Sequence, residues 1–490
     1  MIDTIRKTSV SLKGFYIVTI IGGIFMAIVL DTQLLEGLQQ AIKKANETNT
    51  SVLFSKVVKM HALSPLSFYK IGKEQFQGER LFWQEPIDKI SIVGLGKVDI
   101  LRTDSDKHRF ESIELAWEKL LENSFIQTEE KLPATGPILF GGFSFDYEKS
   151  HSILWELFGD NFFYVPQYML TNCNNGTYFT TNIICTPNGN IKKFLDVIER
   201  GETLRNSTFK MNEYENELLY MDEKEAEQWK QQVANAVSKM QSSHIDKIVL
   251  ARELRLKFKH AISCEMVLDK LLKEQQTSYV FSLEIDNDCF IGASPERLVK
   301  KEQNEVLSTC LAGSIARGST EEEDDELGTT LLHDPKNLIE HQYVVQSIRK
   351  TFLDECIEVN VPNEPVLMKT KHIQHLYTPV RAKCEEGKSI LHLVAKLHPT
   401  PALGGLPKQD AVRWIRENES LQRGFYGAPI GWTDAYGNGE FAVALRSALI
   451  QVNEASLFAG CGIVEDSIPE EEYKETWIKF KPMLNALGGV

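Results

Sequence analysis

The chain has 490 residues, of which 42% are hydrophobic and 25% are charged, so it is long enough to bury a large core. Its net charge of −14 argues against nucleic acid as a partner, because polyanions bind to positively charged surfaces. The 8 cysteines are scattered and form no Cys-x-x-Cys pair, so the common zinc spacings are excluded. Such cysteines in a long chain are typical of a reducing compartment, which predicts a cytoplasmic protein.

An apolar segment near the N-terminus conflicts with this prediction. Phe15 to Leu30 is almost wholly apolar and follows three basic residues, like the core of a signal peptide. It is short for a membrane span, which needs about 20 residues. Three interpretations stay open for residues 1–30: an extension from a mis-assigned start, with translation beginning at Met26; an export or membrane signal; and a buried strand. Outside residues 15–30 we expect no membrane contact.

Residues 31–215 are predicted to form an N-terminal subdomain. Two helices and two strands are indicated by their periodicity, namely helices over Thr32–Asn46 and Ser112–Asn123 and strands over Ile92–Lys97 and Pro137–Asp146. A turn at Pro187-Asn188-Gly189 predicts a hairpin of Tyr178–Cys185 with Asn190–Phe194. Residues 201–222 are polar and lack an apolar period, which predicts a linker between the two halves.

Residues 216–490 are predicted to form the larger domain. Asp222 and Glu225 resemble a capping box before an amphipathic helix. Asp246–Phe258 alternates like a strand, with Lys247 on the same face as small apolar residues. A lysine there can be a charge that blocks edge pairing or a functional group. Ser278–Ala293 is predicted to be a hairpin, which leads directly into Ser294-Pro295-Glu296-Arg297.

The last third of the chain adds two helices and further antiparallel strands. Asp334-Pro335 opens a helix in which Glu340 lies far from the apolar stripe, so spacing alone predicts a solvated side chain. Phe441–Val452 alternates, turns at Asn453-Glu454 and returns as Leu457–Val464. Strands that neighbour in sequence, mixed with helices, predict an α+β fold.

A cluster of charges begins the C-terminal helix after Pro469. Glu472, Glu475 and Lys479 follow at spacings of three and four residues and so share one helix face. This pattern is typical of a solvated, salt-bridged surface. It also suits a magnesium site, because that hard cation takes carboxylate oxygens and often only one or two of them from protein.

Six ordered motifs decide between these interpretations, because together they resemble the chorismate-utilising enzymes: isochorismate, salicylate, anthranilate and aminodeoxychorismate synthases. The motifs are Lys247–Arg252, Ser294–Arg297, Leu311–Ser314, Glu340–His341, His398–Ala402 and Gly460–Val464. Phe82–Pro86 and Phe140–Phe143 match more loosely and most resemble the menaquinone-pathway isochorismate synthases. The resemblance implies two large, mostly antiparallel β-sheets with flanking helices and an active site in a deep cleft, as in anthranilate synthase component I.

The resemblance also implies a magnesium ion and a set of site residues. Glu340 and Glu475 would bind the metal, which holds the ring carboxylate of chorismate, and Glu472 would support it through water. Arg446 would grip the enolpyruvyl carboxylate, for which a bidentate fork is suited, and we expect it on a strand face with Ala442, Ala444 and Ala448. The remaining substrate contacts would be Gly313, Ser314, His375, Ala402, Leu403, Tyr426, Gly460 and Lys479.

Two positions indicate the reaction. Anthranilate synthases, which use ammonia, generally have glutamine where this chain has Lys247, so lysine implies activated water with Lys247 as general base and Glu296 as general acid. Ala402 follows the isochorismate pattern, whereas anthranilate and salicylate enzymes tend to carry threonine. The expected enzyme is thus an isomerase that adds water at ring carbon 2 of chorismate and releases the carbon 4 hydroxyl, without a glutamine amidotransferase subunit.

Other functions stay open at this point. Within the family they are a salicylate synthase and an isochorismate synthase for catechol siderophores. A magnesium phosphotransferase is disfavoured because the sequence lacks a Gly-x-x-x-x-Gly-Lys-Ser/Thr loop. A non-catalytic scaffold held to the membrane by residues 15–30 is disfavoured because the acidic and basic motif residues are intact.

Overall fold

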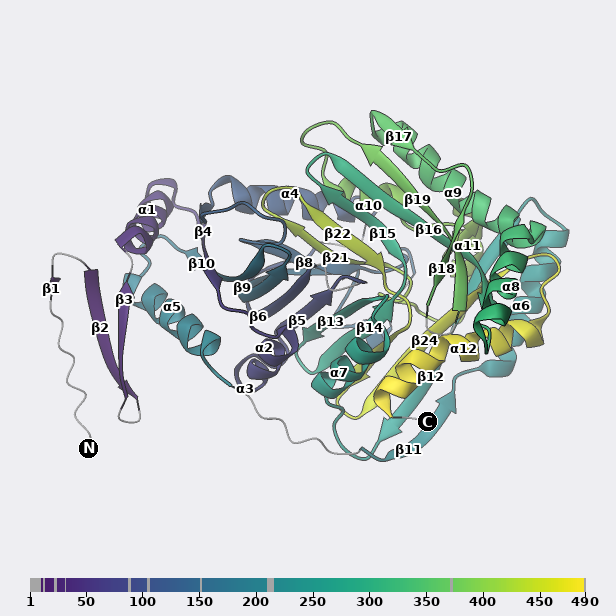
Figure 1. Ribbon diagram of the computed structural model, residues 1–490, viewed down its shortest axis with the longest axis horizontal. Coiled ribbons are helices and arrows are strands. Elements are labelled where there is room, and N and C mark those ends of the chain that lie inside the picture. Colours follow the sequence, from purple (N-terminus) through teal and green to yellow (C-terminus); the bar gives the residue numbers. More distant parts are fainter. Residues whose placement is uncertain are drawn as a thin grey trace.

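The computed structural model describes residues 10–11, 14–21, 24–30, 32–86, 90–103, 106–149, 152–208, 216–370 and 373–488. Figure 1 shows a body of long twisted strands with helices around its outside. The described strand pairs are antiparallel except for one parallel pair. Strands and helices are mixed along the chain, so the predicted α+β class is confirmed. The strands from β4 to β24 form one hydrogen-bonded series that divides into arms at β9 (Asn161–Cys173).

The first arm carries the strand that begins with Lys247. Its order is β11–β12–β24–β23–β14–β13–β5–β6–β9. The strands are β5 (Arg80–Gln84), β6 (Ser91–Leu101), β11 (Leu218–Glu223), β12 (Lys247–Phe258), β13 (Tyr279–Ile285), β14 (Asp288–Ser294), β23 (Ser447–Gln451) and β24 (Glu454–Ile463). The two-residue strand β20 (Gly405–Leu406) pairs with the start of β12.

The second arm runs from β9 through β8, β21, β22, β15 and β16 to β19, with β17 and β18 also on β19. Its strands are β8 (Ile138–Phe143), β15 (Arg297–Glu302), β16 (Glu305–Ala316), β17 (Glu358–Asn360), β18 (Val366–Lys369), β19 (Ile373–Lys383), β21 (Pro429–Asp434) and β22 (Gly439–Val443). A further extension joins β9 to β10 (Gly176–Cys185), β4 (Val52–Met60) and, in parallel, β7 (Phe125–Gln127). Pairs β5–β13 and β8–β21 link the two predicted subdomains, whose boundary at 215/216 stays a prediction.

Helices cover the outer faces of the arms. In Figure 1, α9 lies along β16 and β19, and α12 crosses β24, as their contacts also show. The helices are α1 (Thr32–Thr48), α2 (Pro65–Ile71), α3 (Lys73–Phe76), α4 (Arg109–Glu122), α5 (Ile191–Arg205), α6 (Ala226–Gln241), α7 (Cys264–Glu274), α8 (Glu321–His333), α9 (Pro335–Glu355), α10 (Ile390–Leu397), α11 (Lys408–Asn418) and α12 (Pro469–Leu487), with a 3-10 turn at Ile153–Trp155.

Strand β12 is the centre of this packing. Ile248 to Leu254 are all buried, so the predicted strand is confirmed but is covered on both faces. Ile248 and Leu250 pack in one apolar cluster with the inner face of α6, while Ala251 belongs to the cluster on the other side. Because each such side chain gains roughly 1.5–3 kcal/mol from burial, the position of β12 is firmly held.

The predicted hairpin after β10 is wrong. Its first strand exists, but Ile191–Arg205 is helix α5, and the Asn190 side chain caps it by accepting a hydrogen bond from the Lys192 amide. Phe194, Leu195 and Val197 pack against α1, at a spacing that fits a helix and not a strand. The predicted linker 201–222 is also too long, since α5 ends at Arg205 and β11 begins at Leu218, and residues 209–215 lie outside the described residues.

The two predicted helix starts have different outcomes. Asp334 does cap α9, because its Oδ1 accepts a hydrogen bond from the Asn337 amide at 2.9 Å. The capping box before α6 is not formed, since Asp222 pairs with Lys224 and the residue before the helix, Glu225, has φ 50° and makes no side-chain cap.

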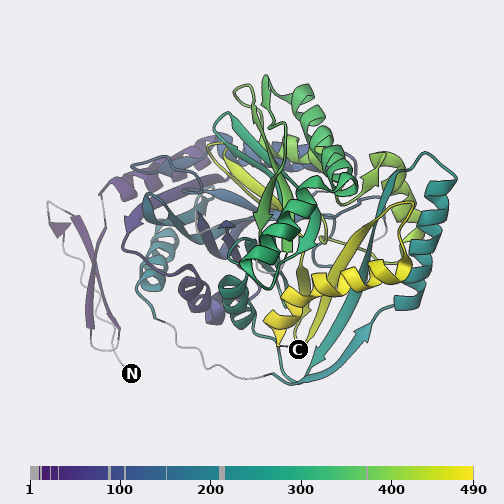
Figure 2. The same ribbon diagram turned by 45° about the vertical axis from the view of Figure 1, so that its right-hand side comes forward.

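The N-terminal apolar segment forms strands. β2 (Gly14–Ile21) and β3 (Ile24–Leu30) make a hairpin, and with β1 (Val10–Ser11) they form a separate 3-stranded sheet. Figures 1 and 2 both show this small sheet beside the main body. The alternative of a buried strand concerns side chains that lie outside the described part of the structure. No described helix has both the length and the apolar character that crossing a membrane requires.

We expect a chain that begins at Met26 to fold like the full chain, because the small sheet pairs with none of the other described strands. The thermal unfolding midpoint should change by less than about 4 °C, the shift that about 1 kcal/mol produces in a protein larger than 150 residues. Scanning calorimetry of both chains measures this. Aggregation of the shorter chain, or a larger drop, would show that the segment contributes to the core.

A disulfide joins Cys356, after α9, to Cys384, after β19. The scattered cysteines predicted a reducing compartment, in which a structural disulfide is rare. The other cysteines are free.

Candidate functional site

Lys247 is the first residue of β12, and a glycine on the neighbouring strand makes room for it. Val249 of β12 pairs with Gly462 of β24. A Cβ atom added at Gly462 would lie 2.5 Å from Cε and 3.1 Å from Nζ of Lys247, so the lysine side chain occupies the space that this glycine leaves. The lysine is therefore turned across the sheet and not out to solvent as an edge charge, and its side chain is 14% exposed.

Glu296 lies between β14 and β15 and is 8% exposed. Its backbone is fixed on both sides: its N–H donates to Ser294 Oγ at 3.2 Å, and its carbonyl accepts from the Val443 amide at 3.0 Å. Burial raises the pKa of Glu296 to about 7, although the nearby ammonium groups of Lys247 and Lys479 act to lower it. A carboxyl group that is half protonated near neutral pH can deliver a proton.

This burial gives a pH-dependent stability. Folding raises the Glu296 pKa from 4.5 to about 7, so its contribution is complete below pH 4.5 and is lost as the pH rises through 7. At pH 8.5 the buried carboxylate should cost about 3 kcal/mol relative to pH 4. We expect Glu296→Gln to be more stable than the parent at pH 8.5 by up to that amount, with little difference at pH 4.5, in urea unfolding. An equal difference at both pH values would contradict the assigned burial effect.

Helix α9 brings Glu340 to Lys247. The next residue, His341, is buried and anchors the helix, with Nδ1 2.9 Å from the Ala312 carbonyl and Nε2 2.7 Å from Thr378 Oγ1. Glu340 Oε2 lies 3.9 Å from Lys247 Nζ, and the Glu340 side chain is 27% exposed. The solvated position that spacing alone predicted is therefore wrong in part. His341 was named only within a motif, and its anchoring role could not be read from the sequence.

Helix α12 brings in the other acidic residues. Lys479 Nζ lies 2.7 Å from Glu475 Oε1 and donates to the Gly460 carbonyl of β24 at 2.9 Å. Glu472 accepts a hydrogen bond from Ser467 Oγ at 2.7 Å, and burial raises its pKa, with the nearby Glu475 carboxylate adding to the effect. The predicted common face of Glu475 and Lys479 is confirmed, and Lys479 reaches from it toward the glycine-lined edge of β24.

His375 offers a ring nitrogen without a partner. β16 and β19 pair with a bulge between Leu311 and Ser314, where Gly313 has φ 80°. Beyond it, Ser314 faces His375, and Ser314 Oγ lies 2.8 Å from Nδ1. His375 Nε2 is buried and has no hydrogen-bond partner among the described residues. Burial lowers the pKa of His375 to about 3, with Arg446 and Lys479 adding to it, so the ring is neutral at pH 7 and free to bond a ligand.

Arg446 differs from its predicted local structure. It does not share a strand face with alanines, because β22 ends at Val443 and β23 begins at Ser447, and Arg446 sits in the kink with φ 47°. Its carbonyl accepts from the Ala293 amide at 3.1 Å. Burial lowers the pKa of Arg446, and among the described residues no hydrogen bond or ion pair to its guanidinium is found. A half-buried guanidinium near His375, without a partner among the described residues, is suited to bind an anion.

Ala402, Leu403 and Tyr426 lie on segments next to β12. The Leu403 amide donates to the Thr400 carbonyl at 3.0 Å, and the strand that follows this turn pairs its Leu406 with Lys247. Tyr426 is buried and its ring stacks on Phe458 of β24, with 5.5 Å between ring centroids. All predicted site segments thus meet around β12 and β24, while the role of each residue stays a prediction.

The predicted magnesium ligands suit the metal in kind but are not drawn into a tight shell. Glu340, Glu472 and Glu475 supply hard carboxylate oxygens. Burial raises the pKa of Glu472, and the Glu475 charge that adds to this effect is one that a cation would offset. Lys247 and Lys479 instead pair with Glu340 and Glu475. Among the described residues, the group whose ligand atoms all lie within 4.8 Å of one another is Cys264, Glu284 and Cys289, so the predicted three lie further apart.

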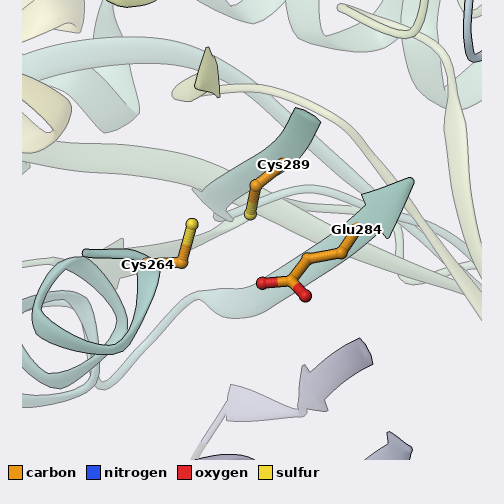
Figure 3. Close-up of side chains that lie close together, drawn as sticks. All are labelled: Cys264, Glu284 and Cys289. Carbon is orange, nitrogen blue, oxygen red and sulfur yellow. The ribbon is translucent and has the colours of Figure 1, made fainter. Parts of the chain in front are cut away.

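Figure 3 shows this second group, in which Glu284 points between two thiols. Its carboxylate is already bound by Arg80, through Nη2 at 2.7 Å and Nε at 2.8 Å, and by the Tyr69 hydroxyl at 2.8 Å. A cation there would lie beside the Arg80 guanidinium, so we interpret the group as part of a buried ion network and not as a metal centre.

Comparison with known proteins fits this geometry. The chain is 45% identical to isochorismate synthase MenF of Bacillus subtilis over 92% of this chain and 96% of that protein. It is 34% identical to the salicylate biosynthesis isochorismate synthase of Pseudomonas aeruginosa, over 92% of this chain and 94% of that protein. The menaquinone-specific isochorismate synthase MenF of Escherichia coli has the same fold, with a TM-score of 0.73 over 92% of this chain and 100% of that one at 21% identity.

The family model described as "chorismate binding enzyme" matches residues 40–488, which is nearly the whole chain without its N-terminal sheet. The match includes every residue that the motifs singled out. The protein therefore belongs to the family of chorismate binding enzymes.

Proposed function

We propose that this protein is an isochorismate synthase, an isomerase that converts chorismate to isochorismate. The observation that carries the proposal is the buried Glu296, which has a pKa of about 7 and lies near the ammonium groups of Lys247 and Lys479. An acid and a base of this kind are what an exchange of hydroxyl groups requires. The relatives named above are isochorismate synthases over nearly their full length, which supports the same activity here.

In the proposed reaction Lys247, as its neutral amine, takes a proton from the water molecule that attacks ring carbon 2 and becomes an ammonium. The ring double bonds shift and the bond from carbon 4 to its hydroxyl breaks. Glu296 gives its proton to this leaving hydroxyl, so one water is consumed and one is formed. The two groups exchange roles in the reverse reaction.

The substrate is a dianion, and the site offers matching cations. Arg446, whose guanidinium has no described partner, would bind the enolpyruvyl carboxylate in a bidentate manner. His375 Nε2 and Lys479 would bond the oxygens nearby. Gly313, Ser314, Gly460, Tyr426 and Leu403 would shape the rest of the site.

We infer that Mg²⁺ completes this site. Glu340 and Glu475 would hold it, and Glu472 would support it through water. When bound, the ion would neutralise the ring carboxylate and withdraw negative charge from the ring. The hard carboxylate oxygens of these residues, and the nearby Glu475 charge that adds to the raised pKa of the partly buried Glu472, support this inference.

The Lys247–Glu296 arrangement favours water over ammonia as the nucleophile, so no glutamine amidotransferase subunit is proposed. We propose menaquinone synthesis as the pathway, supported by the full-length match to MenF of Bacillus subtilis. A siderophore role is the alternative, and isochorismate synthase EntC of Escherichia coli matches only 53% of this chain. The cytoplasmic location stays a prediction from the scattered cysteines.

Incubation of the pure protein with chorismate and Mg²⁺, followed by chromatography and a pyruvate assay, tests the activity. Isochorismate without pyruvate is the expected result. Salicylate with stoichiometric pyruvate would support the salicylate synthase alternative. Unchanged chorismate would refute the proposed function, and with it every role assigned above.

Ala402 should select the product. We expect Ala402→Thr to slow isochorismate formation about tenfold, because the added methyl and hydroxyl groups crowd the ring on the side of the incoming water. Pyruvate release should rise relative to isochorismate, measured in the same assay. As a control, Ala435→Thr alters an alanine that none of the predicted motifs includes. An unchanged rate and product ratio in Ala402→Thr would show that position 402 does not line the pocket.

A further inference from the structure

The edge of β12 has a gap in its strand pairing just after Lys247. One edge of β12 pairs with β24 from Ile248 to Lys257. The other edge pairs with β20 at Lys247 and Ile248, and with β11 from Leu254 to Phe258. Between its pairings with β20 and β11, this edge of β12 has no neighbouring strand. The backbone N–H and C=O groups that face this edge each need another hydrogen-bond partner if they are buried.

A buried ion pair fills this gap. The Val249 carbonyl accepts from Arg423 Nη2 at 2.7 Å, and the Ala251 amide donates to Glu419 Oε2 at 2.7 Å. Arg423 and Glu419 pair with each other through two hydrogen bonds of 2.7 Å, from Nε to Oε1 and from Nη2 to Oε2. Together they offer one donor and one acceptor to β12, as a neighbouring strand would. Their side chains are 4% and 1% exposed.

Arg423 also contacts two other parts of the site, one through its guanidinium and one through its backbone carbonyl. Arg423 Nη1 donates to the Leu403 carbonyl at 3.1 Å, in the turn that carries Ala402. The Arg423 carbonyl accepts from the Tyr426 amide at 2.9 Å. The Phe145 ring lies 4.2 Å from the guanidinium carbon, so the side chain is also covered on one face.

We propose that Arg423 and Glu419 are positioning residues for the reaction: they fix the β12 segment behind Lys247 to the Ala402–Leu403 turn and to Tyr426. This inference rests on the proposed function and adds residues that touch neither substrate nor metal. A purely structural pair would lose stability when altered but leave turnover per folded molecule unchanged. A positioning pair would lose turnover, because a shift of about 1 Å in a reacting group costs about 100-fold in rate.

Arg423→Lys tests the inference, because a lysine keeps the charge but cannot reach Glu419, Val249 and Leu403 with one planar fork. We expect kcat for isochorismate formation to fall about 10- to 100-fold. KM for chorismate should change less than about threefold, because the proposed anion-binding groups lie on other segments. Glu419→Gln, which keeps an acceptor for the Ala251 amide, should show a smaller loss of kcat in the same direction.

Arg416→Lys is the matched control. Arg416 lies in α11, the helix that ends just before Glu419, and it pairs with Asp146 at 2.7 Å and with Glu148. Among the described residues its side chain makes no hydrogen bond to β12 or to the 400–406 turn. Its kcat should equal that of the parent. All rates are normalised to folded protein, measured by circular dichroism and active-site titration with chorismate.

The outcomes separate the two claims. An active parent with a parent-like kcat in Arg423→Lys and Glu419→Gln overturns the positioning role and leaves the proposed function intact. So does a loss of kcat as large in Arg416→Lys. If Arg423→Lys does not fold, Glu419→Gln alone decides in the same way. A parent that does not convert chorismate refutes the proposed function and this inference with it.

Discussion

Lys247→Ala should lose about 100- to 10,000-fold in kcat for isochorismate formation, while its dissociation constant for chorismate changes less than about threefold. The lysine is the proposed base, and general bases contribute about 10²–10⁴ in rate. Its side chain lies across Gly462, so its removal opens space without disturbing the pairing of β12 with β24. Steady-state kinetics and calorimetric titration with chorismate measure the two quantities separately.

The control for this variant lies at the other end of the same strand. Lys257 Nζ pairs with Glu454 Oε1 at 2.7 Å, on a part of β12 remote in sequence from the site. Lys257→Ala should therefore keep the parent kcat, and any stability lost should be within about 1 kcal/mol. If Lys247→Ala converts chorismate at near the parent rate with the same pH profile, Lys247 is not the base.

The second large effect is expected at the proposed metal ligands. Glu340→Gln and Glu475→Gln each replace a charged oxygen by a neutral amide of the same shape, so the fold should persist. Because Mg²⁺ dehydrates reluctantly and relies on few protein carboxylates, the loss of one should cost about 100-fold in activity at limiting Mg²⁺. Activity is measured against Mg²⁺ concentration, with circular dichroism to verify the fold.

Helix α12 supplies a control for these variants. Glu471 pairs with Lys474 at 2.9 Å on an exposed part of the helix, at 65% exposure of the glutamate side chain. Glu471→Gln should show the Mg²⁺ dependence of the parent. Full activity of Glu340→Gln or Glu475→Gln at limiting Mg²⁺ would remove that residue from the metal site, and the ion pairs with Lys247 and Lys479 would then be their structural role.

The local elements of the fold followed from the sequence where one period was clear. The α1 and α4 helices, the β12 strand and the β13–β14 hairpin all form close to the predicted bounds. Errors arose where a local signal competed with packing. The turn residues before α5 favoured a hairpin, but apolar residues at helical spacing packed against α1 decided the outcome.

The site itself could not be assembled from periodicity. Lys247, Glu296 and Lys479 are far apart in the sequence, and spacing alone left both lysines open between a surface role and a functional one. The ordered motifs of the family supplied the set, and the structure brings it together around β12 and β24. The kink at Arg446 and the pair of Arg423 with Glu419 left no sequence signal, because each depends on backbone groups that only the folded sheet presents.

The most direct test of the central claim is the fate of labelled water. The purified protein is incubated with chorismate and Mg²⁺ in water enriched in ¹⁸O, and the product is analysed by mass spectrometry. Addition of water at carbon 2 with loss of the carbon 4 hydroxyl predicts isochorismate that carries one ¹⁸O atom in its new ring hydroxyl. Unlabelled isochorismate, or no isochorismate at all, would contradict it.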